Sequence, residues 1–134
     1  MTDKRTLNGI DKIKNSIESK EYTIAFKNSK SIIDSLVLNS HYWIFKRKPA
    51  KKPLYPTRQI EGLLRMTKTK PEIKKIIEKK TFKQTLKWYT KYQDMLNNPE
   101  CKTAKNPSKF AKKTLHVIQL LNMSAVKIKS NFRK

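Results

Sequence analysis

Apolar side chains recur every three or four residues along most of the chain, and no segment alternates steadily between apolar and polar positions. This spacing is typical of amphipathic helices, whereas a half-buried strand alternates with a period of two. The pattern therefore predicts an all-α protein, a single compact bundle of five or six helices. No stretch repeats at the period of a solenoid, so we expect one helical domain over residues 1–134.

Two helices are expected within residues 1–45. The first covers about residues 6–19, and the second is long, beginning at Tyr22 and extending to about Phe45. The apolar positions of the first helix are Leu7, Ile10 and Ile17, with Lys14 at the same spacing. Those of the second are Tyr22, Ala25, Phe26, Ile32, Ile33, Leu36, Val37 and Ile44.

A basic, proline-containing connector follows the second helix. Residues 46–56 hold three prolines, which fix φ and remove backbone donors, so a helix does not continue through them. A third helix is expected from Pro56 or Thr57, and Pro71 suits the first turn of a fourth. The apolar positions of these two helices are Ile60, Leu63, Leu64 and Met66, then Ile73, Ile76 and Ile77.

Two further helices complete the expected bundle. The fifth covers about residues 81–97, with Thr81 as its N-cap, so that helices three to five occupy residues 57–97. The last covers residues 106–130, with Asn106 as N-cap before a proline in the first turn. Their apolar positions are Phe82, Leu86, Tyr89, Tyr92 and Leu96, then Phe110, Thr114, Val117, Ile118, Leu121, Ala125 and Ile128.

The charge is large and unevenly distributed. The 134 residues include 32 Lys and Arg against 10 Asp and Glu, for a formal net charge of +22. Residues 1–45 are almost balanced, whereas residues 46–60 and 101–134 contain no acidic residue at all. Self-repulsion on this scale opposes a compact state, and a bound polyanion relieves it. The alternative is a surface that lysine merely solvates, although such surfaces normally intersperse Glu and Asp.

The composition excludes several classes of protein. Aromatic and branched aliphatic residues along the whole length exclude a disordered basic tail. The one cysteine, Cys101, excludes a disulfide framework and a multi-cysteine zinc site, and indicates a reducing compartment. The first twelve residues contain no apolar signal region, and the longest strongly apolar run is Tyr42 to Phe45, so we expect neither secretion nor a membrane span.

The sequence offers little for catalysis. His41 and His116 have no acidic residue nearby in sequence to orient them as bases, and Gly9 and Gly62 are isolated, so no glycine loop can cradle a phosphate. HxxxH, CxxC and paired-Asp motifs are absent from the sequence. We therefore expect a non-enzymatic protein with no metal and no other cofactor.

Three groups of basic residues are candidates for binding nucleic-acid phosphates. The connector holds the first group, which also resembles a nuclear-import signal. The second repeats along one face of the fifth helix, where like charges four residues apart destabilise a helix by roughly 0.2–0.5 kcal/mol per pair. The third surrounds the first turns of the last helix, where cations oppose the helix dipole unless an anion binds. The groups are Lys46, Arg47, Lys48, Lys51 and Lys52; Lys79, Lys80, Lys83, Lys87 and Lys91; and Lys105, Lys109, Lys112 and Lys113.

Two other sets of residues on the fifth and last helices can be explained without a ligand. Trp88 and Tyr92 lie beside the lysine row of the fifth helix, where they either pack in the core, the commoner fate, or stack on bases. The cations at the end of the last helix suit the helix dipole and need no ligand. They are Lys127, Lys129, Arg133 and Lys134.

Together these features favour a nucleic-acid-associated protein that acts in transcription or DNA packaging. It would bind DNA, or RNA, with little sequence specificity, because lysine is a point charge and arginine, the usual reader of guanine, is scarce. One alternative is a protein–peptide adaptor whose grooves hold an acidic or amphipathic segment. Another is binding to an anionic membrane surface.

The helix order and several residues resemble a known helical-bundle family. A short helix, a long helix, a loop and a compact set of shorter helices is similar to the bundle shared by the N-terminal domain of transcription elongation factor TFIIS and the integrase-binding domain of lens epithelium-derived growth factor. The resemblance covers residues 5–97. It depends on Ile13-Lys14-Asn15-Ser16-Ile17 and on Ile73, Ile76, Ile77, Lys79, Tyr89, Lys91, Met95 and Leu96.

The resemblance implies an adaptor without catalytic activity. Such domains bind short disordered peptides of transcription and chromatin proteins through their inter-helix loops, and in the integrase-binding example an acidic residue of the first loop is central. Glu21 is the residue of this chain that would take that role, whereas the proline-containing insertion at 46–56 departs from the family pattern. A nuclear location is expected from this resemblance to transcription and chromatin adaptors.

The Lys- and Asn-rich composition also resembles small proteins of large DNA viruses. For such a protein, a location in a viral factory or in the virion is expected instead.

An aromatic cluster ends the long second helix. Trp43 and Phe45 belong to the run Tyr42-Trp43-Ile44-Phe45. If these rings are exposed, they favour a homodimer contact; if they are buried, they form a corner of the core.

Overall fold

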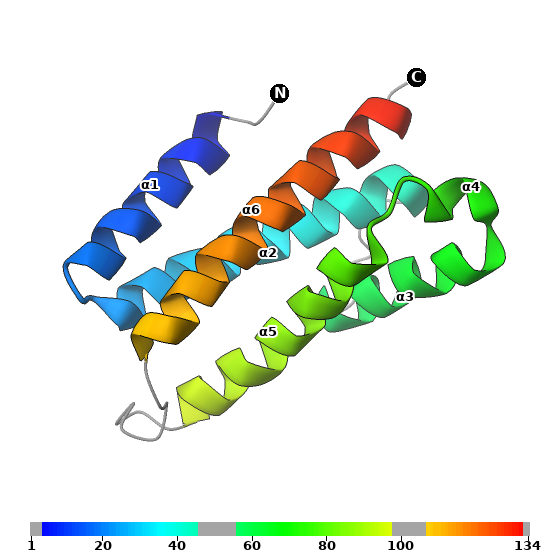
Figure 1. Ribbon diagram of the computed structural model, residues 1–134. Coiled ribbons are helices and arrows are strands. Elements are labelled where there is room, and N and C mark those ends of the chain that lie inside the picture. Colours follow the sequence, from blue (N-terminus) through cyan, green and yellow to red (C-terminus); the bar gives the residue numbers. More distant parts are fainter. Residues whose placement is uncertain (1–3, 46–55, 98–106, 133–134) are drawn as a thin grey trace, which may run out of the picture.

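The predicted all-α bundle is confirmed. The computed structural model describes residues 4–45, 56–97 and 107–132, and within these ranges it contains six helices and no strand (Figure 1). The six are α1 (Lys4–Glu18), α2 (Tyr22–Phe45), α3 (Pro56–Thr69), α4 (Pro71–Lys74), α5 (Lys79–Asn97) and α6 (Pro107–Phe132).

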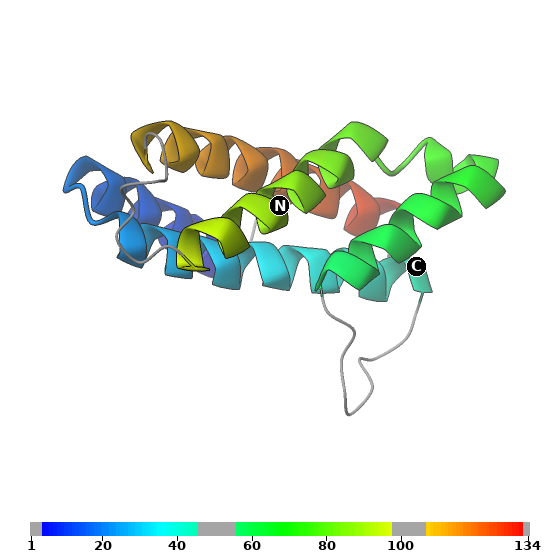
Figure 2. The ribbon, with the colours of Figure 1, turned by 90° about the horizontal axis from the view of Figure 1, so that it is seen from below.

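The two longest helices, α2 and α6, form the centre of the bundle. They pack along each other in the same direction, with α1 on one side of the pair and α5 on the other (Figures 1 and 2). Helix α5 runs antiparallel to α6, and α3 connects the end of α2 to α5 through its contacts with both (Figure 2). One cluster of buried side chains draws on all six helices, with Ile13, Ile33, Phe82 and Leu121 fully buried.

The apolar face of α1 differs from the expected one. Leu7 is 49% exposed, whereas Ile13, which lies on the same face as Ile10 and Ile17, is completely buried. At 3.6 residues per turn, Leu7 points about 90° away from the mean direction of the three isoleucines. The face toward α2 is therefore the isoleucine row, and the expectation that Leu7 belongs to it was wrong.

The helix ends differ from expectation by one or two residues, except at α4. Helix α5 begins at Lys79 instead of residue 81, so Thr81 is not its N-cap. Glu78 occupies that position: its carbonyl accepts the backbone N–H of Phe82 (3.3 Å), and its carboxylate accepts the hydroxyl of Thr81 (3.2 Å). Helix α4 ends at Lys74, and Ile77 is buried from the turn that follows it, because the chain leaves the helix to reach the core.

A Schellman motif ends α1 without a glycine. The backbone N–H of Glu21 bonds to the carbonyl of Ser16 (2.8 Å), and that of Lys20 bonds to the carbonyl of Ile17 (3.0 Å). This places Lys20 at φ 61°, in the left-handed region where a Cβ is strained. Lys20 is the only non-glycine residue of the described ranges with a positive φ.

We expect Lys20→Gly to raise the free energy of unfolding by about 1 kcal/mol, because glycine removes the strained Cβ at this position. Urea denaturation followed by circular dichroism measures the change. The control is Ser19→Gly, whose φ is not positive, and it should leave stability unchanged or lower. An equal gain in both variants would contradict the assignment.

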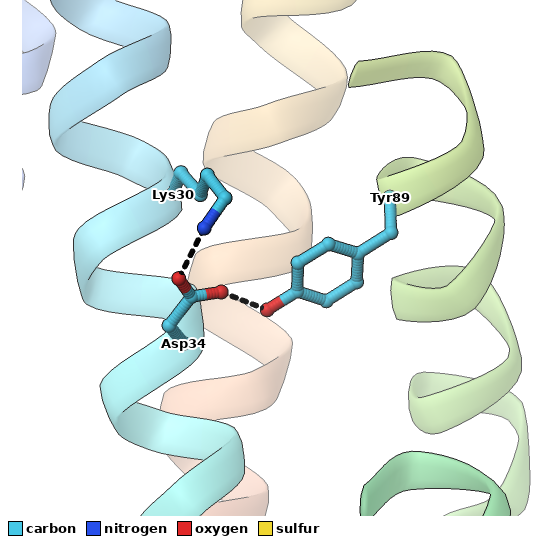
Figure 3. Close-up of polar contacts among 3 residues, drawn as sticks. All are labelled: Lys30, Asp34 and Tyr89. Atoms are coloured by element: carbon cyan, nitrogen blue, oxygen red, sulfur yellow. Dashed lines mark hydrogen bonds and ion pairs between the residues drawn. The ribbon is translucent and has the colours of Figure 1, made fainter. Parts of the chain in front are cut away.

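A polar contact joins α2 to α5 beside the core. Figure 3 shows the Tyr89 ring reaching from α5 to the Asp34 carboxylate of α2, which accepts the phenol O–H. The other oxygen of Asp34 pairs with the Lys30 ammonium group at 2.6 Å. Burial, together with the hydrogen bond to Asp34, raises the pKa of Tyr89 far above its ordinary value, so the phenol stays a donor.

We expect Tyr89→Phe to lower the free energy of unfolding by about 1.5 kcal/mol, because a hydrogen bond to a carboxylate is lost. Tyr42→Phe is the control, since Tyr42 lies at the surface and its change should stay within about 0.5 kcal/mol. Equal effects in the two variants would show that the Asp34 contact contributes nothing to stability.

Candidate nucleic-acid interface

The lysine row of α5 lies on the side of the helix away from the core. All five of its members are exposed: Lys79, Lys80, Lys83, Lys87 and Lys91. The opposite face is buried and consists of Thr81, Phe82, Thr85, Trp88, Tyr89 and Tyr92. Because the buried face holds α5 against the bundle, the lysines have solvent in front of them.

Trp88 and Tyr92 belong to the core. Of the two interpretations of these rings, core packing is therefore correct and stacking on bases is not. Each is 3% exposed, and their rings stack on each other with centroids 5.0 Å apart. Trp88 also lies parallel to Phe110 of α6, at 6.2 Å and an interplanar angle of 8°. Neither ring is available for stacking on a base.

A buried hydrogen bond sets the position of α5 against α6. The indole Nε1–H of Trp88 donates to the Thr114 hydroxyl (2.7 Å), which in turn donates to the carbonyl of Phe110 (2.7 Å). Thr114 is 1% exposed, so no water competes for these groups. Sequence spacing placed Thr114 on the buried face of its helix, but nothing in the pattern identified Trp88 as its partner.

The contact between the two helices brings two lysines together at the surface. Lys91 lies one turn beyond Trp88, and Lys113 immediately precedes Thr114. Lys91 lies near enough to Lys113 across the α5–α6 junction for its charge to act on the Lys113 ammonium group. The interaction with Lys91 lowers the pKa of Lys113 below the ordinary lysine value.

The other sequence-predicted cations fall into two sets. Lys109 and Lys112 are exposed near the start of α6, on the same two turns as Lys113. The connector group, Lys46 to Lys52, and Lys105 lie outside the described residues, and so do Arg133 and Lys134. The second group of candidates and most of the third are therefore exposed on two neighbouring helices, α5 and α6.

Acidic residues are concentrated away from α5 and α6. These two helices carry ten lysines and one acidic residue, Asp94, whereas α1 to α4 carry ten basic and five acidic residues. A salt bridge joins Lys30 and Asp34 on α2. The exposed lysines of α5 and α6 therefore have one acidic residue on their own helices, whereas the other helices are mixed.

The residues proposed for protein partners lie elsewhere on the bundle. Glu21 is exposed in the turn between α1 and α2. Trp43 and Phe45 are half-buried and pack against the core, and the Phe45 ring lies 4.4 Å from that of His41. The aromatic end of α2 is thus partly a corner of the core.

The described residues form no metal site and no membrane-spanning helix. In residues 4–45, 56–97 and 107–132, no three His, Cys, Asp or Glu side chains converge as a metal site requires. No helix in these segments has both the length and the apolarity to cross a bilayer.

Comparison with protein-family models, curated proteins and solved structures finds no match. Within the described residues, the protein is an all-α bundle of six helices with exposed lysines on α5 and α6.

We expect Thr114→Val to lower the free energy of unfolding by about 1–3 kcal/mol, because it leaves the buried indole N–H of Trp88 without an acceptor at nearly constant side-chain volume. Thermal denaturation provides the measurement. Thr90→Val is the matched control: Thr90 is exposed on α5, its hydroxyl bonds only locally to the Leu86 carbonyl, and its change should stay within about 0.5 kcal/mol. A loss no larger than that of the control would contradict the role of Thr114.

Proposed function

We propose that this protein is a non-enzymatic nucleic-acid-binding protein whose α5–α6 surface binds backbone phosphates. The observation that carries the proposal is the concentration of ten lysines and one acidic residue on these two helices. Lysine surfaces that serve only solubility usually contain acidic neighbours, which reduce repulsion. A polyanion supplies the missing negative charge and releases its own condensed counterions.

The shape of the surface supports a backbone ligand. Residues four apart on α5 are about 6 Å apart along the helix axis, so Lys83, Lys87 and Lys91 form a row about 12 Å long. Lys113, which lies near Lys91, extends this row onto α6. A linear array of cations across two helices suits a linear array of phosphates.

Binding of this kind carries little sequence information. Lysine ammonium groups bind phosphates as point charges, whereas base readout relies on bidentate groups such as the arginine guanidinium. Helices α5 and α6 contain no arginine, and Trp88 and Tyr92 are buried. The proposed protein therefore binds duplex DNA, or RNA, with weak sequence preference, as expected for a role in packaging or transcription.

We expect the affinity for a 20-base-pair duplex of arbitrary sequence to fall steeply with salt. The triple variant Lys80→Gln/Lys83→Gln/Lys87→Gln should reduce the slope of log K against log salt by up to about 2.7, since each lost phosphate contact removes about 0.9. Fluorescence anisotropy across ionic strength measures both quantities.

The control variant is Lys12→Gln/Lys14→Gln/Lys27→Gln. It changes net charge by the same amount on exposed positions of α1 and α2, and it should leave the slope almost unchanged. Equal effects of the two triple variants would show that net charge alone matters. A wild-type protein that binds no duplex at low salt, but retains a protein partner after nuclease treatment, would support the adaptor function instead.

A further inference from the structure

The outer face of α2 is uncharged in a protein that is otherwise strongly cationic. Between residues 28 and 45 the charged side chains are Lys30 and Asp34, which pair with each other. The exposed residues of α1, α3, α5 and α6, by contrast, include lysine or arginine on each helix. Helix α2 lies along one edge of the bundle, and α6 packs on its inner side (Figure 2). The uncharged face is therefore open to a neighbouring molecule.

A regular stripe of residues runs along this face. Its members are alternately four and three residues apart, which is the heptad spacing of a coiled-coil seam. Both ends are apolar, with Ile24 50% and Tyr42 36% exposed, and these are two of the four large apolar side chains that are exposed within the described residues. The stripe, which we call the α2 seam, consists of Ile24, Asn28, Ser31, Ser35, Leu38 and Tyr42.

The α2 seam is complementary to itself when it is reversed. If two copies of α2 pack antiparallel about a two-fold axis level with Ile33, Ile24 of one copy lies opposite Tyr42 of the second copy. In the same register Asn28 lies opposite Leu38, and Ser31 lies opposite Ser35. Large apolar side chains then meet at both ends of the seam, and small serines at its centre let the helices approach closely. A two-fold contact requires this kind of self-complementary surface.

The distribution of charge favours a second copy of this chain as the occupant. A polyanion or an acidic peptide is attracted to the lysines of α5 and α6, whereas the α2 seam offers it no positive charge. Two copies that each carry a formal charge of +22 repel each other through their cationic faces. The uncharged face of α2 is where this repulsion is smallest.

We propose that this protein forms an antiparallel homodimer through the α2 seam. The contact uses Tyr42, whereas Trp43 and Phe45 pack against the core of their own bundle. The seam is one helix wide, about 10 Å by 36 Å, and is smaller than the roughly 800 Å² per partner of a stable interface. The association is therefore reversible. The dimer carries two α5–α6 lysine surfaces, so under the proposed function it binds nucleic acid bivalently.

Sedimentation equilibrium of the full-length protein without nucleic acid tests the dimer. We expect a monomer–dimer equilibrium that shifts toward the dimer as salt is added, because salt screens the repulsion between two cationic copies. Duplex binding has the opposite salt dependence. A wild-type protein that stays monomeric at high protein concentration and high salt would overturn the homodimer.

A charge placed at the centre of the seam tests which face is used. Ser35→Lys should weaken dimerisation by about tenfold or more, because it puts two like charges close to the two-fold axis. The matched control is Ser130→Lys, which adds the same charge at an exposed position of α6 and should leave dimerisation almost unchanged. Circular dichroism verifies that both variants remain helical. Equal effects of the two variants would overturn the assignment to α2.

Disulfide crosslinking tests the antiparallel register. In a Cys101→Ser background, oxidation of a mixture of Ile24→Cys and Tyr42→Cys proteins should give a crosslinked dimer. Either variant alone should not crosslink, because in the antiparallel pair two copies of one position lie about 27 Å apart. The mixed dimer keeps one native contact between Ile24 and Tyr42. Crosslinking of each variant with itself would show a parallel pair and overturn the proposed register.

The homodimer and the proposed function fail independently. Salt-dependent duplex binding by a protein that stays monomeric would overturn the homodimer and leave the proposed function intact. A dimer that Ser35→Lys disrupts, in a protein that binds no duplex at low salt, would support the α2 seam and overturn the proposed function.

Discussion

The interface between α5 and α6 is the constraint on which the binding surface depends. Its buried part is apolar and aromatic, with Trp88 against Phe110, and includes the hydrogen bond from Trp88 to Thr114. A buried donor that loses its acceptor destabilises the fold, so this bond selects one register of the two helices over others. Every lysine on the outer faces of α5 and α6 takes its position from that register.

The bundle holds together two halves with different charge balance. Helices α1 to α4 combine basic and acidic residues. In α2, Asp34 pairs with Lys30 and also accepts the hydrogen bond of Tyr89 from α5. Helices α5 and α6 have almost no acidic residues, so the repulsion among their lysines must be balanced by apolar burial of α6 against α2 and of α5 against α3 and α6. Phe82, Ile118 and Leu121 are completely buried and supply part of that balance. The buried apolar side chains thus offset the repulsion among the lysines on the surface of α5 and α6.

Helix positions and the core were largely predictable from the sequence. Tyr22 and Phe45 bound the second helix as expected, and Thr114, Val117, Ile118, Leu121 and Ile128 are buried along α6. The errors have local causes. Thr81 was taken for an N-cap because its residue type suits one, but Glu78 fills that position, and Leu7 lies at helical spacing yet outside the face that meets α2. Spacing defines a helix, and the direction of its neighbour defines which side is buried.

What the sequence determined by itself is the helical class, the surplus of positive charge and the row of lysines along α5, because helical periodicity and net charge are local or additive properties. Only the tertiary structure decided that Trp88 and Tyr92 are core residues and that Lys91 of α5 lies near Lys113 of α6. These two arrangements depend on how one helix is rotated and shifted along another. Many packed side chains, far apart in the sequence, set that rotation and shift together. For this reason the cationic face was visible in the sequence, whereas the point at which its two helices converge was not.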